Sequence, residues 1–238
     1  MSELIPRVLV TGTDTDLGAA VQKYFENAAA VTVGSVAGPA DAERLSGSVR
    51  TVYADPTDRA EVRDAVHTAA AAMGGLDTLV VAHSLPMVQP FVEQTMTDFW
   101  HHVDTALTGS FLYAQAAAEV MRAAGSGGRI VLTTSKWHVG GQNLSAVATA
   151  AGGIVALTKT LTRDFGHFGI GVNAVAVGAV DSEWSVCDAA GGDALPPLGR
   201  LGTVEQVARV IGVLCQRRLG AAVGQIVNVD GGLSRNRV

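Results

Sequence analysis

A short run of polar and ionisable side chains, Ser135-Lys136-Trp137-His138, has the clearest potential for chemistry in this chain. A hydroxyl can orient a carbonyl group, a desolvated amine can act as a nucleophile, and an imidazole can act as a general base. His83 is a further candidate because the ordinary pKa of histidine lies near neutrality. We therefore predict four catalytic residues: Ser135, Lys136, His138 and His83.

Each of these residues also has a plainer interpretation. Lys136 is compatible with a solvated loop residue, and Trp137 with a lid or a contact between subunits. His83 is compatible with a hydrogen-bonded structural histidine, which is the commoner role of a lone histidine. The residue types alone leave both interpretations open.

The candidate residues follow a predicted strand from Arg129 to Thr134, and an Ala- and Gly-rich helix that continues past Lys159 comes after them. Short apolar runs alternate with amphipathic stretches elsewhere in the chain, which is typical of a parallel sheet covered on both faces. We predict an α/β fold: a Rossmann-like doubly wound sheet of seven parallel strands in a single domain, residues 1–238. The other predicted strands are 7–10, 31–33, 50–54, 79–82, 170–177 and 225–229.

Composition excludes several classes of protein. The chain has 238 residues, of which 48% are apolar and 16% charged, so it can bury a large core. Its Lys and Arg residues are scattered and its net charge is -5, which disfavours a nucleic-acid partner. Neither a leader peptide nor an apolar run of about 18 residues is evident, so we expect a cytoplasmic protein with no membrane partner. Cys187 and Cys215 are expected to be free thiols, and no metal site is predicted.

Several short motifs occur in a characteristic order along the chain. Through these motifs the chain resembles the short-chain dehydrogenase/reductase family over essentially its whole length. The resemblance implies NAD or NADP as cofactor, a small-molecule substrate, and a homo-tetramer or dimer assembled through two long helices. The motifs are Thr11-Gly12 through Gly18, Asp55-Pro56-Thr57-Asp58, Leu107-Thr108-Gly109, Gly128-Arg129-Ile130-Val131, Val172-Asn173-Ala174-Val175, Arg200-Leu201-Gly202-Thr203 and Asp230-Gly231-Gly232.

The resemblance also assigns cofactor-binding residues. Asp16 replaces the middle glycine of the family's first motif, where a carboxylate opposes a pyrophosphate at the helix N-terminus; alternatively, Asp16 turns outward and caps the helix. His83 follows the fourth strand and is expected beside the cofactor groove. NAD or NADP binding is therefore in question, and Gly34-Ser35 gives no indication of which is preferred. The expected cofactor-binding residues are Gly12, Thr13, Leu17, Gly18, Asp55 and Ala82.

Three of the family's four catalytic residues are replaced. Ser135 matches the catalytic serine, but Ala106, Val147 and Ala151 stand where the family has Asn, Tyr and Lys. Because apolar side chains cannot transfer protons, the leading hypothesis is a non-redox reaction such as an elimination, a cyclisation or an aldol step on a small organic molecule. One alternative is a non-catalytic homologue that acts as a subunit or binding module, in a hetero-oligomer with an active relative. Another is an NAD(P)-dependent oxidoreductase with a substituted proton donor.

The remaining predictions concern the substrate pocket. Trp137, Trp184 and Asn143 are expected to line it, because in relatives these loops border the substrate side of the cleft. Trp184 is alternatively a contact between subunits. His101-His102 has no third ligand at metal spacing, so both residues are expected on the surface.

Overall fold

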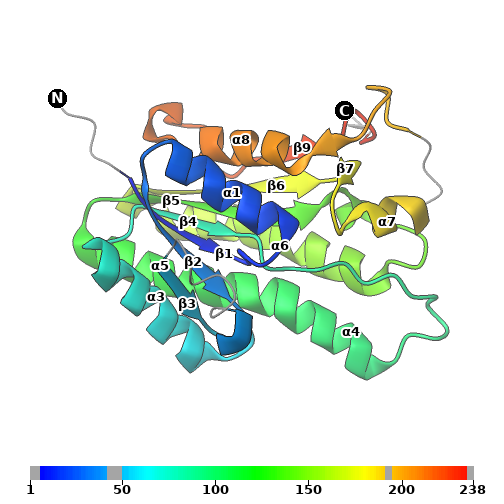
Figure 1. The fold of residues 1–238 in the computed structure, drawn as a ribbon, viewed down its shortest axis with the longest axis horizontal. Helices are drawn as coiled ribbons and strands as arrows, with labels where there is room; N and C mark the ends of the chain where they lie inside the picture. The colour runs from blue at the N-terminus through cyan, green and yellow to red at the C-terminus, as the bar shows by residue number, and fades with distance from the viewer. Residues whose placement is uncertain (1–5, 42–49, 191–194, 235–238) are drawn as a thin grey trace.

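The computed structural model describes residues 6–41, 50–190 and 195–234, and seven of its strands form one parallel sheet (Figure 1). The strand order is β3-β2-β1-β4-β5-β6-β9, which confirms the predicted doubly wound fold. The N-terminal stretch on which the leader expectation depends lies largely outside the described residues. The seven strands are β1 (Arg7–Thr11), β2 (Val31–Val36), β3 (Arg50–Tyr53), β4 (Thr78–Val81), β5 (Gly128–Ser135), β6 (Ile170–Val177) and β9 (Ile226–Val229).

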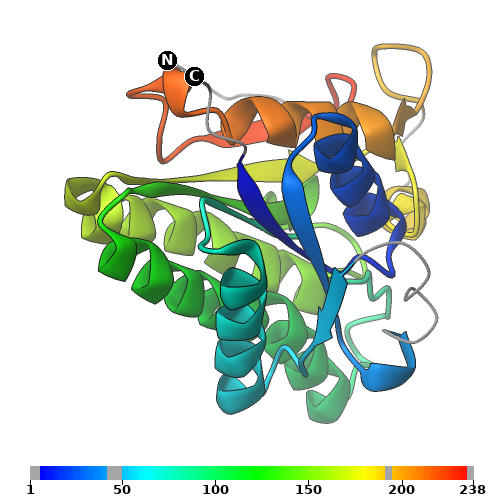
Figure 2. The same ribbon diagram turned by 60° about the vertical axis from the view of Figure 1, so that its left-hand side comes forward.

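Helices cover both faces of this sheet, as Figures 1 and 2 show. Helices α1 and α8 pack on one face, and α3, α5 and α6 pack on the other. A separate two-stranded sheet, β7 (Val180–Asp181) with β8 (Gly202–Thr203), lies near α7. The helices are α1 (Asp16–Asn27), α3 (Arg59–Met73), α4 (Met96–Val103), α5 (Gly109–Ala124), α6 (Ser145–Phe165), α7 (Ser185–Ala190) and α8 (Val204–Leu214), with short segments η1 (Asp104–Thr108), η2 (Lys136–Val139), η3 (Gly166–Phe168) and η4 (Arg217–Leu219).

Strand β1 shows how the apolar runs of the sequence build two cores. Leu9 packs into the cluster under α3, α5 and α6, whereas Val8 and Val10 pack into the cluster under α1 and α8. Successive side chains of a strand point to opposite faces, so a strand buried on both faces must be apolar throughout. The continuous run that predicted a buried strand is therefore required by the double layer of helices.

The spacing of Trp100, Val103, Leu107, Phe111 and Leu112 predicts a long helix with one apolar face from Thr97 to Ala124. This helix is present, but it contains a π-helical segment. Helix α4 passes through η1 into α5 without leaving helical geometry, and Ala106 is buried at this segment. The prediction of one apolar face is wrong for Trp100 and Phe111, which are 52% and 42% exposed. Assembly into a dimer or tetramer stays a prediction.

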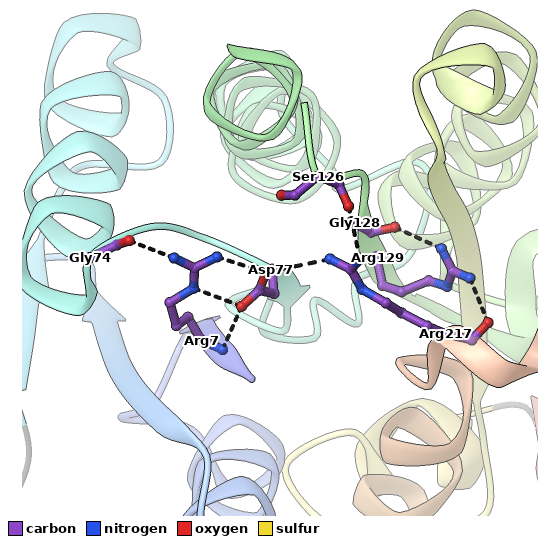
Figure 3. A network of polar contacts seen from close by, with 7 residues as sticks. All are labelled: Arg7, Gly74, Asp77, Ser126, Gly128, Arg129 and Arg217. Carbon is purple, nitrogen blue, oxygen red and sulfur yellow. Dashed lines mark hydrogen bonds and ion pairs between the residues drawn. The ribbon is translucent and has the colours of Figure 1, made fainter. Parts of the chain in front are cut away.

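The amino-terminal edge of the sheet is tied together by charged side chains (Figure 3). Asp77, just before β4, accepts hydrogen bonds from Arg7 Nε at 2.7 Å and Arg7 Nη2 at 2.9 Å. Arg217 reaches the same carboxylate at 3.4 Å and donates to the Ser126 carbonyl. These contacts lower the pKa of Asp77 through hydrogen bonds from Arg7. Three segments distant in sequence are therefore joined at this edge.

The opposite edge of the sheet holds the carboxyl ends of the strands. The strand order reverses between β1 and β4, and in open α/β sheets ligands bind in the crevice at such a switch point. The loops that follow β1, β2 and β4 therefore meet at this crevice. Within the described residues, no helix is both long and apolar enough to cross a membrane.

Candidate active site

A cavity of about 460 Å³ opens at the switch point between β1 and β4. We call it the outer cavity. Its walls come from the loops after β1, β2, β3 and β4, and from the end of α4. The lining residues that matter for the argument are Gly12, Ser35, Asp55, His83, Ser84 and His102.

The turn after β1 depends on two glycines. Gly12 has φ +67°, and a Cβ there would lie 2.4 Å from the His83 Cα. A Cβ at Gly18 would lie 1.9 Å from the Gly12 carbonyl oxygen, so α1 packs directly against this turn. The Thr13 hydroxyl is buried without a hydrogen-bond partner and does not line the outer cavity. The first turn of α1 is thus brought close to the crevice, as a nucleotide-binding turn requires.

The far end of the outer cavity is shaped by Ser35 and Asp55. Ser35 shares a 2.8 Å hydrogen bond with the Tyr113 hydroxyl, whose pKa burial raises to about 12. The Asp55 carboxylate accepts hydrogen bonds from the amide and hydroxyl of Thr57, while Asp58 is the N-cap of α3. Asp55 therefore holds a turn and lines the cavity at once.

His83 lies beside the groove, but its ring is already engaged. Nδ1 lies 2.9 Å from the Thr11 hydroxyl, and Nε2 lies 2.9 Å from the Thr105 carbonyl oxygen. The Thr11 hydroxyl accepts the Ala82 amide proton, so it donates to Nδ1, and Nε2 carries the ring proton. Burial lowers the pKa of His83 to about 4. His83 therefore joins β1 to η1 as a neutral imidazole.

A second, much smaller cavity of about 20 Å³ lies beside Ser135, and we call it the inner cavity. Leu17, Ala106, Val147 and Ala151 line it, so the three positions that the family resemblance aligns with Asn, Tyr and Lys share this cavity. A volume of this size holds about one water molecule. The side chains at these three positions are apolar.

His102 is the ionisable residue that borders both cavities. It is 6% exposed, so the expectation that it lies on the surface is wrong. It lies one helical turn before Ala106 and therefore on the same face of the helix as that residue. Burial, together with the neighbouring His101, lowers the pKa of His102 to about 4, so the ring is neutral at pH 7.

Ser135 is buried at the end of β5 and lines the inner cavity. Its hydroxyl oxygen accepts a hydrogen bond from the Trp137 amide at 3.2 Å, which starts η2. Because the oxygen accepts this bond, the hydroxyl proton can donate into the cavity. Ser135 is therefore placed to orient a substrate oxygen.

Lys136 points away from both cavities. Its ammonium lies 3.3 Å from Asp188 Oδ1 and 4.1 Å from the Trp137 ring centroid, and its side chain is 5% exposed. The other Asp188 oxygen accepts the Ala179 amide proton at 2.7 Å. Held in this ion pair and lining neither cavity, the Lys136 amine is not placed to attack a substrate there. Lys136 thus fixes α7 to η2.

The remaining predicted residues of the loop after β5 are also outside the two cavities. His138 Nδ1 lies 3.0 Å from the Ser135 carbonyl oxygen, within the turn of η2. The Asn143 carbonyl accepts the Gln89 amide proton, and Asn143 has φ +60°. Trp137 packs with Trp184 against Val147, and its indole nitrogen is buried without a partner.

Trp184 lines the inner cavity, and its role in a substrate pocket stays a prediction. Its indole nitrogen donates to the Ser84 carbonyl oxygen at 3.2 Å, so the loop after β7 reaches across to the loop after β4. Cys187 packs beneath it, and burial raises the pKa of this thiol to about 12. A neutral thiol is a poor nucleophile, so Cys187 does not suit that role.

Asp16 is exposed, and the prediction that it caps α1 is wrong because Thr15 is the N-cap. The Asp16 amide instead donates to Glu183 Oε1 at 2.6 Å. A carboxylate from the loop after β7 therefore sits at the N-terminus of α1. Among the described residues, no group of three or more His, Cys, Asp or Glu side chains could hold a metal ion.

Sequence reasoning missed three residues of this site: His102, Tyr113 and Glu183. The spacing of His102 and Ala106, four apart on one helix, is a signal that could have placed His102 beside the replaced Asn. Tyr113 and Glu183 reach the site through tertiary contacts with residues 78 and 167 positions away. Local sequence carries no signal for such contacts.

Comparison with known proteins gives consistent results over nearly the whole chain. Residues 16–234 match the family model described as enoyl-(acyl carrier protein) reductase. The chain is 34% identical over 235 residues to cis-4-hydroxycyclohexanecarboxylate dehydrogenase from Sinomonas cyclohexanicum, covering 94% of each protein. It is 32% identical over 237 residues to (2S)-[(R)-hydroxy(phenyl)methyl]succinyl-CoA dehydrogenase subunit BbsC from Thauera aromatica, covering 95% of this chain and 93% of the other.

A solved structure agrees with these matches. A short-chain type dehydrogenase/reductase from Mycobacterium marinum superposes with a TM-score of 0.84 at 28% identity, covering 95% of this chain and 94% of the other. All these similar proteins are named as dehydrogenases or reductases, which contradicts the leading hypothesis of non-redox chemistry. The hypothesis depended on the alignment of Val147 and Ala151 with the family's Tyr and Lys, whereas the buried imidazole of His102 lines the same cavity. By sequence and by fold, the chain belongs to the short-chain dehydrogenase/reductase family.

Proposed function

We propose that this chain is an NAD(P)-dependent oxidoreductase that interconverts a secondary alcohol and a ketone, with His102 as the proton-transferring group. The observation that carries the proposal is the position of His102, buried between the outer and inner cavities and next to Ser135 in the wall of the inner one. The names of the relatives from Sinomonas cyclohexanicum and Thauera aromatica support an alcohol substrate.

The outer cavity fits the adenosine half of a dinucleotide. Its volume of about 460 Å³ is ample for an adenosine, and Gly12 and Gly18 bring the α1 amides close to it. Ser35 and Asp55 would hold the adenosine end. In this structure Glu183 accepts the Asp16 amide proton at the start of α1, and Trp184 lines the inner cavity. A bound NAD or NADP would supply the hydride acceptor or donor.

We further propose that the catalytic tetrad is degenerate and that His102 replaces its proton relay. In alcohol oxidation the carbon gives up a hydride, the hydroxyl proton passes to the neutral His102 ring, and the carbonyl bond forms. The Ser135 hydroxyl donates a hydrogen bond to the substrate oxygen. His102 then releases the proton through the outer cavity, which it also borders. With a pKa of about 4, the His102 ring is neutral at pH 7, which is the form that accepts a proton.

The test compares His102→Gln with His138→Gln in the reduction of NAD and NADP by a panel of secondary alcohols that includes 4-hydroxycyclohexanecarboxylate and sorbitol. His138 is the matched control because its ring is bound to the Ser135 carbonyl outside both cavities. We expect His102→Gln to lower kcat by about 100-fold or more, and His138→Gln to leave it nearly unchanged. In the wild type, kcat should fall as pH drops through about 4, where His102 becomes protonated.

Two results would count against the proposal in different ways. Equal kcat in His102→Gln and wild type would remove His102 from the mechanism while leaving the oxidoreductase assignment in place. If neither the wild type nor Glu183→Ala, which removes the carboxylate at the start of α1, binds NAD or NADP, the assignment itself is overturned and a non-catalytic homologue is favoured.

A further inference from the structure

We propose that residues 182–188, which we call the plug, close the inner half of the cofactor cleft and must swing out before NAD or NADP binds. The inference rests on the proposed function, because it concerns access of the cofactor to the same cleft. Two side chains of the plug carry it. Glu183 contacts the N-terminus of α1, and Trp184 contacts the loop after β4.

Glu183 occupies the place that a pyrophosphate takes in a dinucleotide fold. Its Oε1 accepts the Asp16 amide proton at 2.6 Å, at the N-terminus of the twelve-residue helix α1. The free amides and the helix dipole make such a terminus a site for anions. Glu183 is an anion supplied by the chain itself, so it competes directly with the phosphates of a dinucleotide.

Trp184 closes the adjoining space. Its indole nitrogen donates to the Ser84 carbonyl at 3.2 Å, and its ring lines the inner cavity together with Ser135. With a volume of about 20 Å³ this cavity admits no aromatic ring, so a nicotinamide cannot approach Ser135 while Trp184 stays in place. Cofactor binding therefore requires both side chains to move.

The two ends of the plug differ in how firmly they are held. Asp188 is bound to the Lys136 ammonium and to the Ala179 amide, which fixes the carboxyl-terminal end. At the other end, Glu183 Oε2 is buried without a hydrogen-bond partner, which costs free energy. Ala179, just before β7, has φ +48°, a strained value for a residue other than glycine. Glu183 and Trp184 are therefore expected to move out of the cleft, while Asp188 keeps its contacts with Lys136 and the Ala179 amide.

The test is calorimetric titration of the full chain with NAD, ADP and adenosine. The variants are Glu183→Ala and the matched control Asp181→Ala, which removes an exposed carboxylate two residues earlier in the chain. We expect Glu183→Ala to bind NAD and ADP at least about tenfold more tightly than wild type, because a charged competitor is removed. Adenosine, which has no phosphate, should bind all three proteins equally. Addition of NAD should also change the tryptophan fluorescence of the wild type, and less so that of Trp184→Phe.

Three outcomes would contradict the proposal that residues 182–188 close the cleft. Equal NAD affinity in wild type and Glu183→Ala would do so while leaving the proposed function intact. An equal gain in Glu183→Ala and Asp181→Ala would attribute the effect to net charge. Failure of wild type and Glu183→Ala to bind NAD, NADP, ADP or adenosine would overturn the proposed function together with the plug.

Discussion

The two edges of the sheet differ in how completely their polar groups are paired. At the amino-terminal edge, Asp77 is shared by Arg7 and Arg217, and the guanidinium groups also bind carbonyl oxygens (Figure 3). At the carboxyl-terminal edge there are two cavities, and the polar atoms Thr13 Oγ1, Trp137 Nε1 and Glu183 Oε2 are buried without partners. A satisfied network stabilises the fold, whereas unsatisfied buried groups lower stability. Stability is thus concentrated at one edge, and capacity for ligands at the other.

The largest difference in stability between the two edges should appear when the pH is lowered. His83 and His102, both at the carboxyl-terminal edge, have folded-state pKa values of about 4, below the unfolded value of ~6.5. The unfolded state therefore binds protons first, and stability is lost as pH falls from ~6.5 towards 4. At pH 5 the loss should reach ~2 kcal/mol for each histidine, or ~4 kcal/mol together. The free energy of unfolding by urea, determined at pH 7.5 and at pH 5, measures this loss.

The variant His102→Leu tests whether this loss of stability arises at the candidate active site. His102→Leu removes one of the two buried imidazoles, so it should show about half of the wild-type change between the two pH values. The pKa of Asp77 is lowered, so Asp77 stays ionised at pH 5 and the amino-terminal network contributes no change. A full wild-type pH dependence in His102→Leu would show that the acid sensitivity arises elsewhere.

The next largest effect should come from the amino-terminal edge. Asp77→Ala removes the acceptor of two Arg7 side-chain hydrogen bonds and of the Arg217 contact, so the free energy of unfolding should fall by ~2 to 3 kcal/mol. Glu119→Ala, which breaks an exposed 3.5 Å ion pair with Arg63, is the control and should cost less than ~1 kcal/mol. Nucleotide affinity should be unchanged in both variants. A weaker affinity in Asp77→Ala would show that the two edges are coupled.

The same contrast explains how much the sequence could predict. The strands and helices follow from local patterns: apolar runs such as that of β1 must be strands buried on both faces, and Gly74 with φ +72° ends α3 as its position suggested. The doubly wound arrangement of the seven strands followed from a family resemblance. Because each of these signals is local or is shared by the family, the fold was predictable.

The site was less predictable because its side chains are oriented by tertiary contacts. Lys136 lies in the expected loop, yet its ion pair with Asp188 turns it away from both cavities. His102 was expected on the surface because the His101-His102 pair has no third ligand at metal spacing, whereas its side chain is buried. The position of a residue in a motif thus indicates the loop on which it lies, and not the direction of its side chain.

The smallest effect should come from Tyr113, which lies between the core and the outer cavity. Tyr113→Phe removes its 2.8 Å hydrogen bond with Ser35, so the free energy of unfolding should fall by ~1 kcal/mol. Tyr53→Phe is the control, because Tyr53 is 54% exposed, and it should leave stability unchanged. In Tyr113→Phe the Ser35 hydroxyl remains buried without its partner, so adding Ser35→Ala should cost less than Ser35→Ala alone. Strictly additive losses in the double variant would mean that the hydrogen bond does not couple the two residues, and that the outer cavity is held by packing alone.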